Sequence, residues 1–128
     1  MNSRINLTDE KDLIINKIKK AKTDPLPMPK TTKELDERLE AKNLIGIYSS
    51  LTNSTIEKSV ESFAGKNFSE FKEKLSQVLV DKIEPISLEI KKLLNDQSYL
   101  DKILLDGAEK ADLIASKKIK KIKEIVGF

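Results

Sequence analysis

The sequence predicts an all-α protein, a bundle of five to seven helices. Apolar residues recur at three- and four-residue steps along nearly the whole chain, and no segment alternates apolar and polar residues as a strand does. The 128 residues include only four Gly, four Pro and no Trp, which favours helices over a sandwich or a barrel. Charged residues make up 35% and apolar residues 38%, a balance typical of a folded domain.

The first predicted helix begins after Leu7, where Thr8 or Asp9 can cap it. Several lysines fill its last turns, where cations suit the helix dipole. Its end is set by Pro25, because the residue before a proline is biased out of the helical region. The alternating prolines of residues 25–29 then predict a stiff, extended connector, with a partner-docking peptide as the alternative. The apolar stripe of the helix consists of Leu13, Ile14, Ile15, Ile18 and Ala21.

Three shorter helices are predicted next. Thr32 can cap a short, exposed helix in the charge-rich segment 30–42. A short buried helix follows from residue 43, and Gly46 allows it to pack closely. Ser54 and Glu57 have the spacing of a capping box, which opens the third helix.

The longest predicted helix follows Gly65, which ends the preceding helix as a C-cap glycine. Ser69 can cap it, and its apolar residues recur at helical spacing as far as Leu94. Pro85 lies inside this pattern and should kink the helix or split it in two, because proline removes a helical hydrogen bond.

The C-terminal part is predicted to hold two helices. Ser98 with Asp101 resembles a cap that opens a short one, and Gly107 marks the junction to a last helix that ends at about Val126. This last helix carries a stripe of small residues that we expect to pack inside the bundle. The stripe consists of Ala108, Ala111 and Ala115.

Composition excludes several kinds of site. The absence of Cys excludes disulfides and thiolate metal ligands, and the absence of His removes the commonest general base. Three nearby carboxylates lack the convergent oxygen ligands of a calcium loop, so we assign no metal and expect dipole and ion-pair roles. No membrane span or signal peptide is predicted, which indicates the cytoplasm. The three carboxylates belong to Asp106, Glu109 and Asp112.

The strongest charge feature is residues 117–123, which hold five lysines in seven positions. On a helix, Ile119, Ile122 and Val126 can face the core while four lysines, at positions 110, 117, 120 and 121, face outward. Such a face can contact nucleic-acid phosphates, or it can be a solvated face that complements the helix dipole. The net charge of +3 permits a nucleic-acid partner without requiring one. The candidate phosphate contacts are Lys110, Lys117, Lys120 and Lys121.

Aromatic side chains are the candidates for stacking on unpaired bases. Most of them are expected to lie in the core, since aromatics at helical spacing usually pack inward. Phe68 is the best candidate because it follows Gly65-Lys66 in an expected loop. The aromatics considered are Tyr48, Phe68, Phe71, Tyr99 and Phe128.

Five segments, in order and at matching spacing, resemble the C-terminal helical region of bacterial tryptophanyl-tRNA synthetases, a family of class I synthetases. They are Ser3 to Asp24, Asn43 to Leu51, Phe63 to Lys72, Pro85-Ile86, and Gly107 to Ala115 with the Gly-Phe finish. The HIGH-like and KMSKS signatures of the family are absent, so no catalytic residue is assigned. The resemblance implies that the full-length parent is an ATP-dependent, homodimeric tryptophan–tRNA ligase. For this chain alone it implies a monomer that is catalytically inactive and binds no cofactor.

The resemblance also implies two parts of the chain with different functions. Residues 1–29 correspond to the helix that follows the absent KMSKS loop, together with the proline-rich connector. In the parent, Ser3 and Arg4 would then lie near the active site. Residues 30–128 correspond to a domain that binds the anticodon end of the tRNA for tryptophan. The implied partners are that tRNA and the missing catalytic domain. The alternatives are a purely structural helical lever and a stand-alone interaction module without affinity for RNA.

Overall fold

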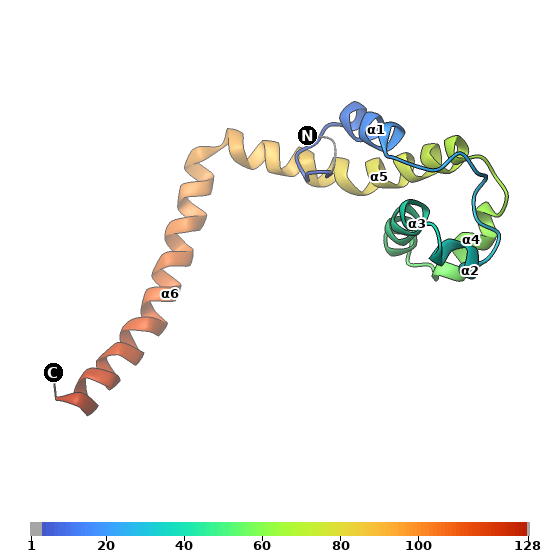
Figure 1. Ribbon diagram of the computed structural model, residues 1–128. Coiled ribbons are helices and arrows are strands. Elements are labelled where there is room, and N and C mark those ends of the chain that lie inside the picture. Colours follow the sequence, from blue (N-terminus) through green and yellow to red (C-terminus); the bar gives the residue numbers. More distant parts are fainter. Residues whose placement is uncertain (1–3, 128) are drawn as a thin grey trace. The chain divides into compact units, whose positions relative to one another are not determined.

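The computed structural model describes residues 4–127, in which there are six α-helices and no strand (Figure 1). The predicted all-α class is confirmed. The helices are α1 (Lys11–Lys20), α2 (Thr32–Asp36), α3 (Leu39–Thr52), α4 (Ile56–Phe63), α5 (Phe68–Asn95) and α6 (Gln97–Val126). The chain divides into two compact units, one up to Leu88 and one from Glu89 onward. None of these helices combines the length and apolar character needed to cross a membrane.

The hydrophobic core lies in the first unit. Helix α1 contributes Ile14 and Ile18, which are one turn apart and almost fully buried, as the apolar stripe predicted. Helix α5 contributes a row at four-residue steps, and α2, α3 and α4 pack against one another beside it (Figure 1). The row on α5 consists of Phe71, Leu75, Leu79 and Ile83.

Asp9 does not cap α1 as predicted. Glu10 occupies the N-cap position but makes no side-chain capping hydrogen bond, while Asp9 is buried. Its carboxylate accepts hydrogen bonds from the Asn6 backbone N–H (2.9 Å) and from the buried Lys17 ammonium (2.5 Å). Lys17 therefore neutralises a buried carboxylate and is not part of an exposed lysine face.

The proline-rich connector is packed against the domain. Met28 is buried, and its N–H donates to the Lys66 carbonyl (2.8 Å) while its carbonyl accepts from the Gly65 N–H (3.1 Å). The guanidinium of Arg38 donates to both carboxylate oxygens of Asp24 and to the Pro27 carbonyl. The connector is thus held at both ends by hydrogen bonds.

Three of the predicted caps are shifted along the chain. Thr31, not Thr32, caps α2, and its hydroxyl accepts from the Glu34 N–H. Thr55, not Ser54, caps α4, and the Ser54 hydroxyl hydrogen-bonds to another hydroxyl within the first unit. Ser69 lies in the first turn of α5, which begins one residue earlier. In each case the residue chosen from sequence lies within one position of the observed cap or helix start.

Two predictions about glycines in the first unit differ from the structure. Gly65 has φ +70°, a conformation that suits glycine, but the C-cap of α4 is Ala64, and the Gly65 N–H donates to the Met28 carbonyl and not to the helix. At Gly46 an added Cβ would meet no atom within 4 Å, so the predicted close packing there is wrong. Helix α3 also begins earlier than predicted, at Leu39, and it ends at Thr52, followed by the C-cap residue Asn53 in the left-handed region.

The two longest helices are continuous where breaks were predicted. Helix α5 runs through the exposed Pro85, so of the two predicted outcomes, a kink or a split, the split is wrong and the kink stays a prediction. Helix α6 runs through Gly107, so the predicted junction is wrong as well. Asp96 caps α6 instead of Ser98, accepting from the Tyr99 N–H (3.0 Å).

Candidate nucleic-acid interface

The four candidate phosphate-binding lysines all lie on α6 and are all exposed. At about 100° per residue, Lys110, Lys117 and Lys121 fall within roughly 20° of one line along the helix. Lys120 lies about 80° to one side of that line. The helix therefore gathers the four cations on one face, named here the lysine face of α6. It runs from residue 110 to residue 121, which is roughly 16 Å of helix.

The lysine face also contains acidic groups. The Lys110 ammonium pairs with Asp106 (2.6 Å) one turn away, and Glu124 lies near the same line. The pair is exposed on both sides, so water screens it and it contributes little stability. Lys110 can exchange this partner for another anion at small cost.

The opposite face of α6 is apolar but is not buried. No residue of α6 is buried, although the sequence predicted that the alanine stripe and the isoleucines would pack inside the bundle. The prediction that the alanines and the larger apolar residues share one face of a helix is confirmed. The exposed residues are Ala108, Ala111, Ala115, Ile119, Ile122 and Val126.

The carboxylates near the start of this region form ordinary surface contacts. Asp106 pairs with Lys110, and the Asp112 carboxylate accepts from the Ser116 hydroxyl (3.2 Å). Within residues 4–127, no group of three or more His, Cys, Asp or Glu side chains is arranged to hold a metal ion.

The sequence predicted Phe68 in a loop, but this residue is the first of α5. Its ring is partly buried, and the Arg38 guanidinium carbon lies 5.5 Å from the ring centroid. This cation–π contact involves the same guanidinium that Asp24 fixes. Phe68 also lines a pocket along α5, which keeps part of the ring available for a ligand.

The other aromatic side chains considered for base stacking are Tyr48, Phe71, Tyr99 and Phe128. Tyr48 and Phe71 form edge-to-face contacts with each other and with Phe63, at centroid distances of 4.9–6.0 Å, so they pack in or against the core. Tyr99 is exposed in the first turn of α6. Phe128 lies outside the described residues.

The N-terminal candidates are only partly covered by the structure. Ser3 lies outside the described residues. Arg4 is exposed and lines a pocket of about 790 Å³ with Lys20, Lys22 and Leu44. It is not brought next to Phe68, which lines a different pocket of the same unit.

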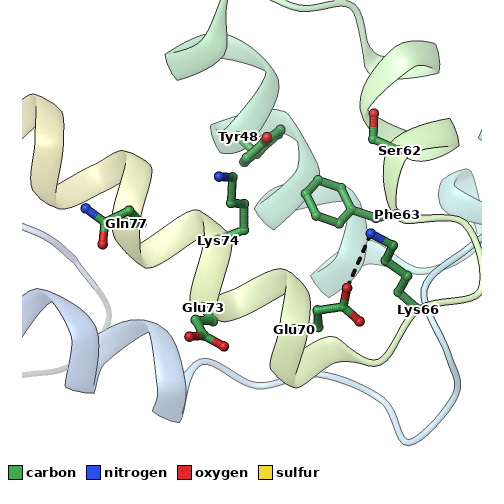
Figure 2. A pocket seen from close by; sticks show the side chains of 8 residues that line it. All are labelled: Tyr48, Ser62, Phe63, Lys66, Glu70, Glu73, Lys74 and Gln77. Atoms are coloured by element: carbon green, nitrogen blue, oxygen red, sulfur yellow. Dashed lines mark ion pairs between the residues drawn. The ribbon is translucent and has the colours of Figure 1, made fainter.

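A second group of cations, missed by the sequence reasoning, lies around Tyr48 and Phe63 (Figure 2). Lys66 and Lys74 line this pocket of about 530 Å³, and the Lys66 ammonium lies 5.5 Å from the Phe63 ring centroid. Lys66 is also 3.3 Å from the Glu70 carboxylate. The sequence held a signal for this pocket. Its residues on α5 share one helix face, which is formed by Glu70, Glu73, Lys74 and Gln77.

No protein-family model matches the chain. A tryptophan–tRNA ligase of Caulobacter vibrioides is 44% identical over 126 residues, which are 98% of this chain and 37% of that relative. The tryptophan–tRNA ligase of Mesorhizobium japonicum is 42% identical, with 98% and 36% covered. That of Rickettsia felis is 45% identical, with 98% and 38% covered. The chain thus spans little more than a third of the length of these curated relatives.

Proposed function

We propose that this chain, which is homologous to the tryptophan–tRNA ligases over 98% of its residues, provides a surface that binds the anticodon end of the tRNA for tryptophan. The family resemblance stated from the sequence is confirmed. The homology is the observation that carries the proposal of tRNA binding. ATP-dependent aminoacylation is proposed only for a complete ligase and not for this chain alone. We propose the cytoplasm as the location of the protein.

The lysine face of α6 supports this proposal on chemical grounds. Lysine ammonium groups bind phosphates as point charges, and each contact releases counterions from the nucleic acid. Four exposed ammonium groups within roughly 16 Å of helix match a run of backbone phosphates. Such contacts position an RNA without reading its bases. Base selection then has to come from other groups, for which Phe68 is the candidate that the sequence provides.

The first test is a titration of labelled tRNA for tryptophan with the 128-residue chain at several salt concentrations. We expect affinity to fall steeply with salt. Replacing Lys110, Lys117, Lys120 and Lys121 together with alanine should weaken binding and lower the slope of log K against log salt by about 3 to 4.

A matched control separates specific contacts from net charge. Four exposed lysines of the first unit, changed to alanine together, remove the same charge from elsewhere on the chain. They are Lys11, Lys33, Lys58 and Lys82. If both quadruple variants lose affinity equally, or if binding ignores salt, the assignment of phosphate contacts to α6 is wrong.

We further propose that the chain alone does not activate tryptophan. Its sequence lacks the HIGH-like and KMSKS signatures, whose residues bind ATP and stabilise the developing charge. The check is tryptophan-dependent exchange of pyrophosphate into ATP with the purified chain. We expect no exchange above background, and measurable exchange that follows the protein through purification would contradict this proposal.

A further inference from the structure

A pocket of about 740 Å³ in the first unit is lined by Phe68, the base-selection candidate, and by polar residues that have no role in the function proposed above. It lies beside one face of α5, from the start of that helix to its third turn, and it also includes the end of α1 and residue Thr23. Its lining is rich in hydrogen-bond donors. The polar lining residues used below are Lys19, Thr23, Ser69, Lys72, Glu73 and Ser76.

Lys72 is the central cation of this pocket. Its ammonium donates to the carbonyls of Ala21 (2.6 Å) and Lys19 (3.3 Å), at the end of α1. An ammonium has three N–H donors, so these two contacts leave one for a ligand. Burial lowers the pKa of Lys72, because removing water disfavours the charged form. An anion in the pocket would restore a favourable environment for that charge.

The N-terminus of α5 adds to the positive potential. The first N–H groups of a helix have no partner within the helix, and the dipole of this 28-residue helix places partial positive charge there. Ser69 lies in that first turn and lines the pocket. Lys19, an exposed lysine, supplies a second ammonium from α1.

Ser76 provides an independent sign of a missing ligand. It lines the pocket and is only 4% exposed. Among the residues that the structure describes, its Oγ is the one buried side-chain oxygen or nitrogen without a hydrogen-bond partner. Because buried polar groups are almost always hydrogen-bonded, the unpaired hydroxyl of a residue that lines this donor-rich pocket calls for an acceptor.

We propose that this pocket binds a phosphate group, held by Lys19, Lys72 and the hydroxyls of the pocket. The balance of charge favours an anion, since two ammonium groups and a helix N-terminus outweigh the one carboxylate, that of Glu73. The group belongs either to an RNA backbone or to a small phosphorylated molecule. None of the residues that form the pocket lies on α6, so the site does not depend on the lysine face.

The test is a titration of the isotope-labelled chain with inorganic phosphate at constant ionic strength, followed by amide NMR signals. We expect saturable shifts centred on Thr23, Ser69 and Ser76, with a dissociation constant on the order of 1 mM. Lys19→Ala should weaken binding on the order of tenfold, because it removes a charge-assisted contact. Glu73→Gln should strengthen binding a few-fold, because it removes the like charge.

Ser76→Ala provides the internal check on folding. Removing an unpaired hydroxyl should leave the unbound chain as stable as before or more stable, yet it should weaken phosphate binding. Lys58→Ala, an exposed lysine on α4, is the matched control and should change nothing. Absence of saturable shifts, or shifts that Lys19→Ala and Ser76→Ala leave unchanged, would overturn the proposal.

A second arm of the experiment identifies the source of the phosphate. A short single-stranded RNA that displaces inorganic phosphate from the pocket indicates an RNA backbone. Saturation by inorganic phosphate with no displacement by RNA indicates a small phosphorylated ligand. If the quadruple lysine variant of α6 loses tRNA binding while the pocket still titrates, the two sites are separate, and each proposal succeeds or fails alone.

Discussion

At the scale of single residues, the buried pair of Asp9 and Lys17 is the clearest electrostatic feature of the first unit. The two side chains are 5% and 7% exposed, so neither charge is well solvated without the other. Hydrogen bonds from Lys17 and from the Asn6 backbone hold the pKa of Asp9 below its usual value. The pair fixes the segment before α1 to the helix itself.

Asp9→Asn tests this pair. The amide keeps the shape but leaves the Lys17 ammonium buried without a counter-charge, so we expect a loss of about 2–4 kcal/mol in the free energy of unfolding, measured with urea. Asp36→Asn is the matched control, because it breaks the exposed Lys42–Asp36 pair and should cost less than about 1 kcal/mol. Equal losses in the two variants would show that burial of the Asp9 pair has no energetic effect.

The same pair gives a pH dependence with a definite sign. A carboxyl whose folded pKa is lowered contributes stability above its unfolded pKa, and that contribution is lost as pH falls toward the folded pKa. We therefore expect the chain to lose stability as pH falls below about 4. Asp9→Asn should flatten this part of the stability curve, and an unchanged acid limb would contradict the assignment.

Arg38 joins three features of the first unit. Its guanidinium donates to both carboxylate oxygens of Asp24, donates to the Pro27 carbonyl and lies over the Phe68 ring. The hydrogen bonds from Arg38 are the main reason that the pKa of Asp24 is lowered. A lysine at this position keeps the charge but loses the planar fork.

We therefore expect Arg38→Lys to lower the free energy of unfolding by about 1–2 kcal/mol in urea titrations. The control is Arg4→Lys, at an exposed position, which should lie within about 0.5 kcal/mol of the parent chain. If the two substitutions have the same effect, then the bidentate geometry at Arg38 does not stabilise the connector.

At this scale helical spacing predicts the two buried residues of α1 but not which polar residues pair. Ile14 and Ile18 follow from helical spacing alone. Asp24 and Arg38 are 14 residues apart with a proline-rich segment between them, and no periodicity relates them. Their pairing depends on the path of the connector, which the backbone hydrogen bonds of Met28 to Gly65 and Lys66 help to fix.

At the scale of helices, Gly107 is the position most open to a direct test. It lies inside α6, and an added Cβ would meet no atom within 4 Å. Gly107→Ala should therefore stabilise α6 by about 1 kcal/mol through helix propensity, seen as slower amide exchange around residue 107. Ala111→Gly, the reverse change one turn later, should have the opposite sign. Destabilisation by Gly107→Ala would contradict the open surroundings described for this glycine.

The shifted caps show why helix ends are harder to predict than helix existence. Residues 31 and 32 are both Thr, and residues 54 and 55 are Ser and Thr, so either member of each pair can accept the capping bond. The backbone decides: Thr31 and Thr55 are extended and precede the first helical residue. Ser54 instead extends a hydroxyl cluster with Thr52 and Ser59.

The sequence predicts the part of the candidate site that lies within one helix, but not the parts that several segments form together. The lysine face of α6 depends on the spacing of residues within one helix, so the sequence was sufficient to find it. The pockets around Phe63 and Ser76 are formed by residues from several segments that pack together, which spacing does not reveal. Phe68 is the base-stacking candidate because the sequence predicts a loop there, and that reason is wrong, since Phe68 is the first residue of α5.

At the scale of the whole molecule, the buried core residues all belong to the unit that ends at Leu88. Helix α1 contributes two of them, so it is an integral part of that unit, although by resemblance residues 1–29 are a linker that serves the catalytic domain. Assignment of separate functions to residues 1–29 and 30–128 stays a prediction.

Hydrogen exchange tests the status of α1. We expect amides of residues 14–20 to be protected to a similar degree as those of residues 75–83, because both segments bury apolar side chains in one core. Amides in α6, which has no buried residue, should exchange faster than either. If α1 exchanges as fast as α6, the linker needs a partner to fold, which is the structural-lever alternative.

Binding of tRNA through the lysine face of α6 is the function proposed for this homologue of tryptophan–tRNA ligases. It is best tested by a residue-resolved NMR footprint of the tRNA for tryptophan on the isotope-labelled 128-residue chain. We expect the signals of Lys110, Lys117, Lys120 and Lys121 to shift or broaden first and to recover when salt is raised. A footprint that leaves α6 unchanged, or no footprint at low salt, would contradict it.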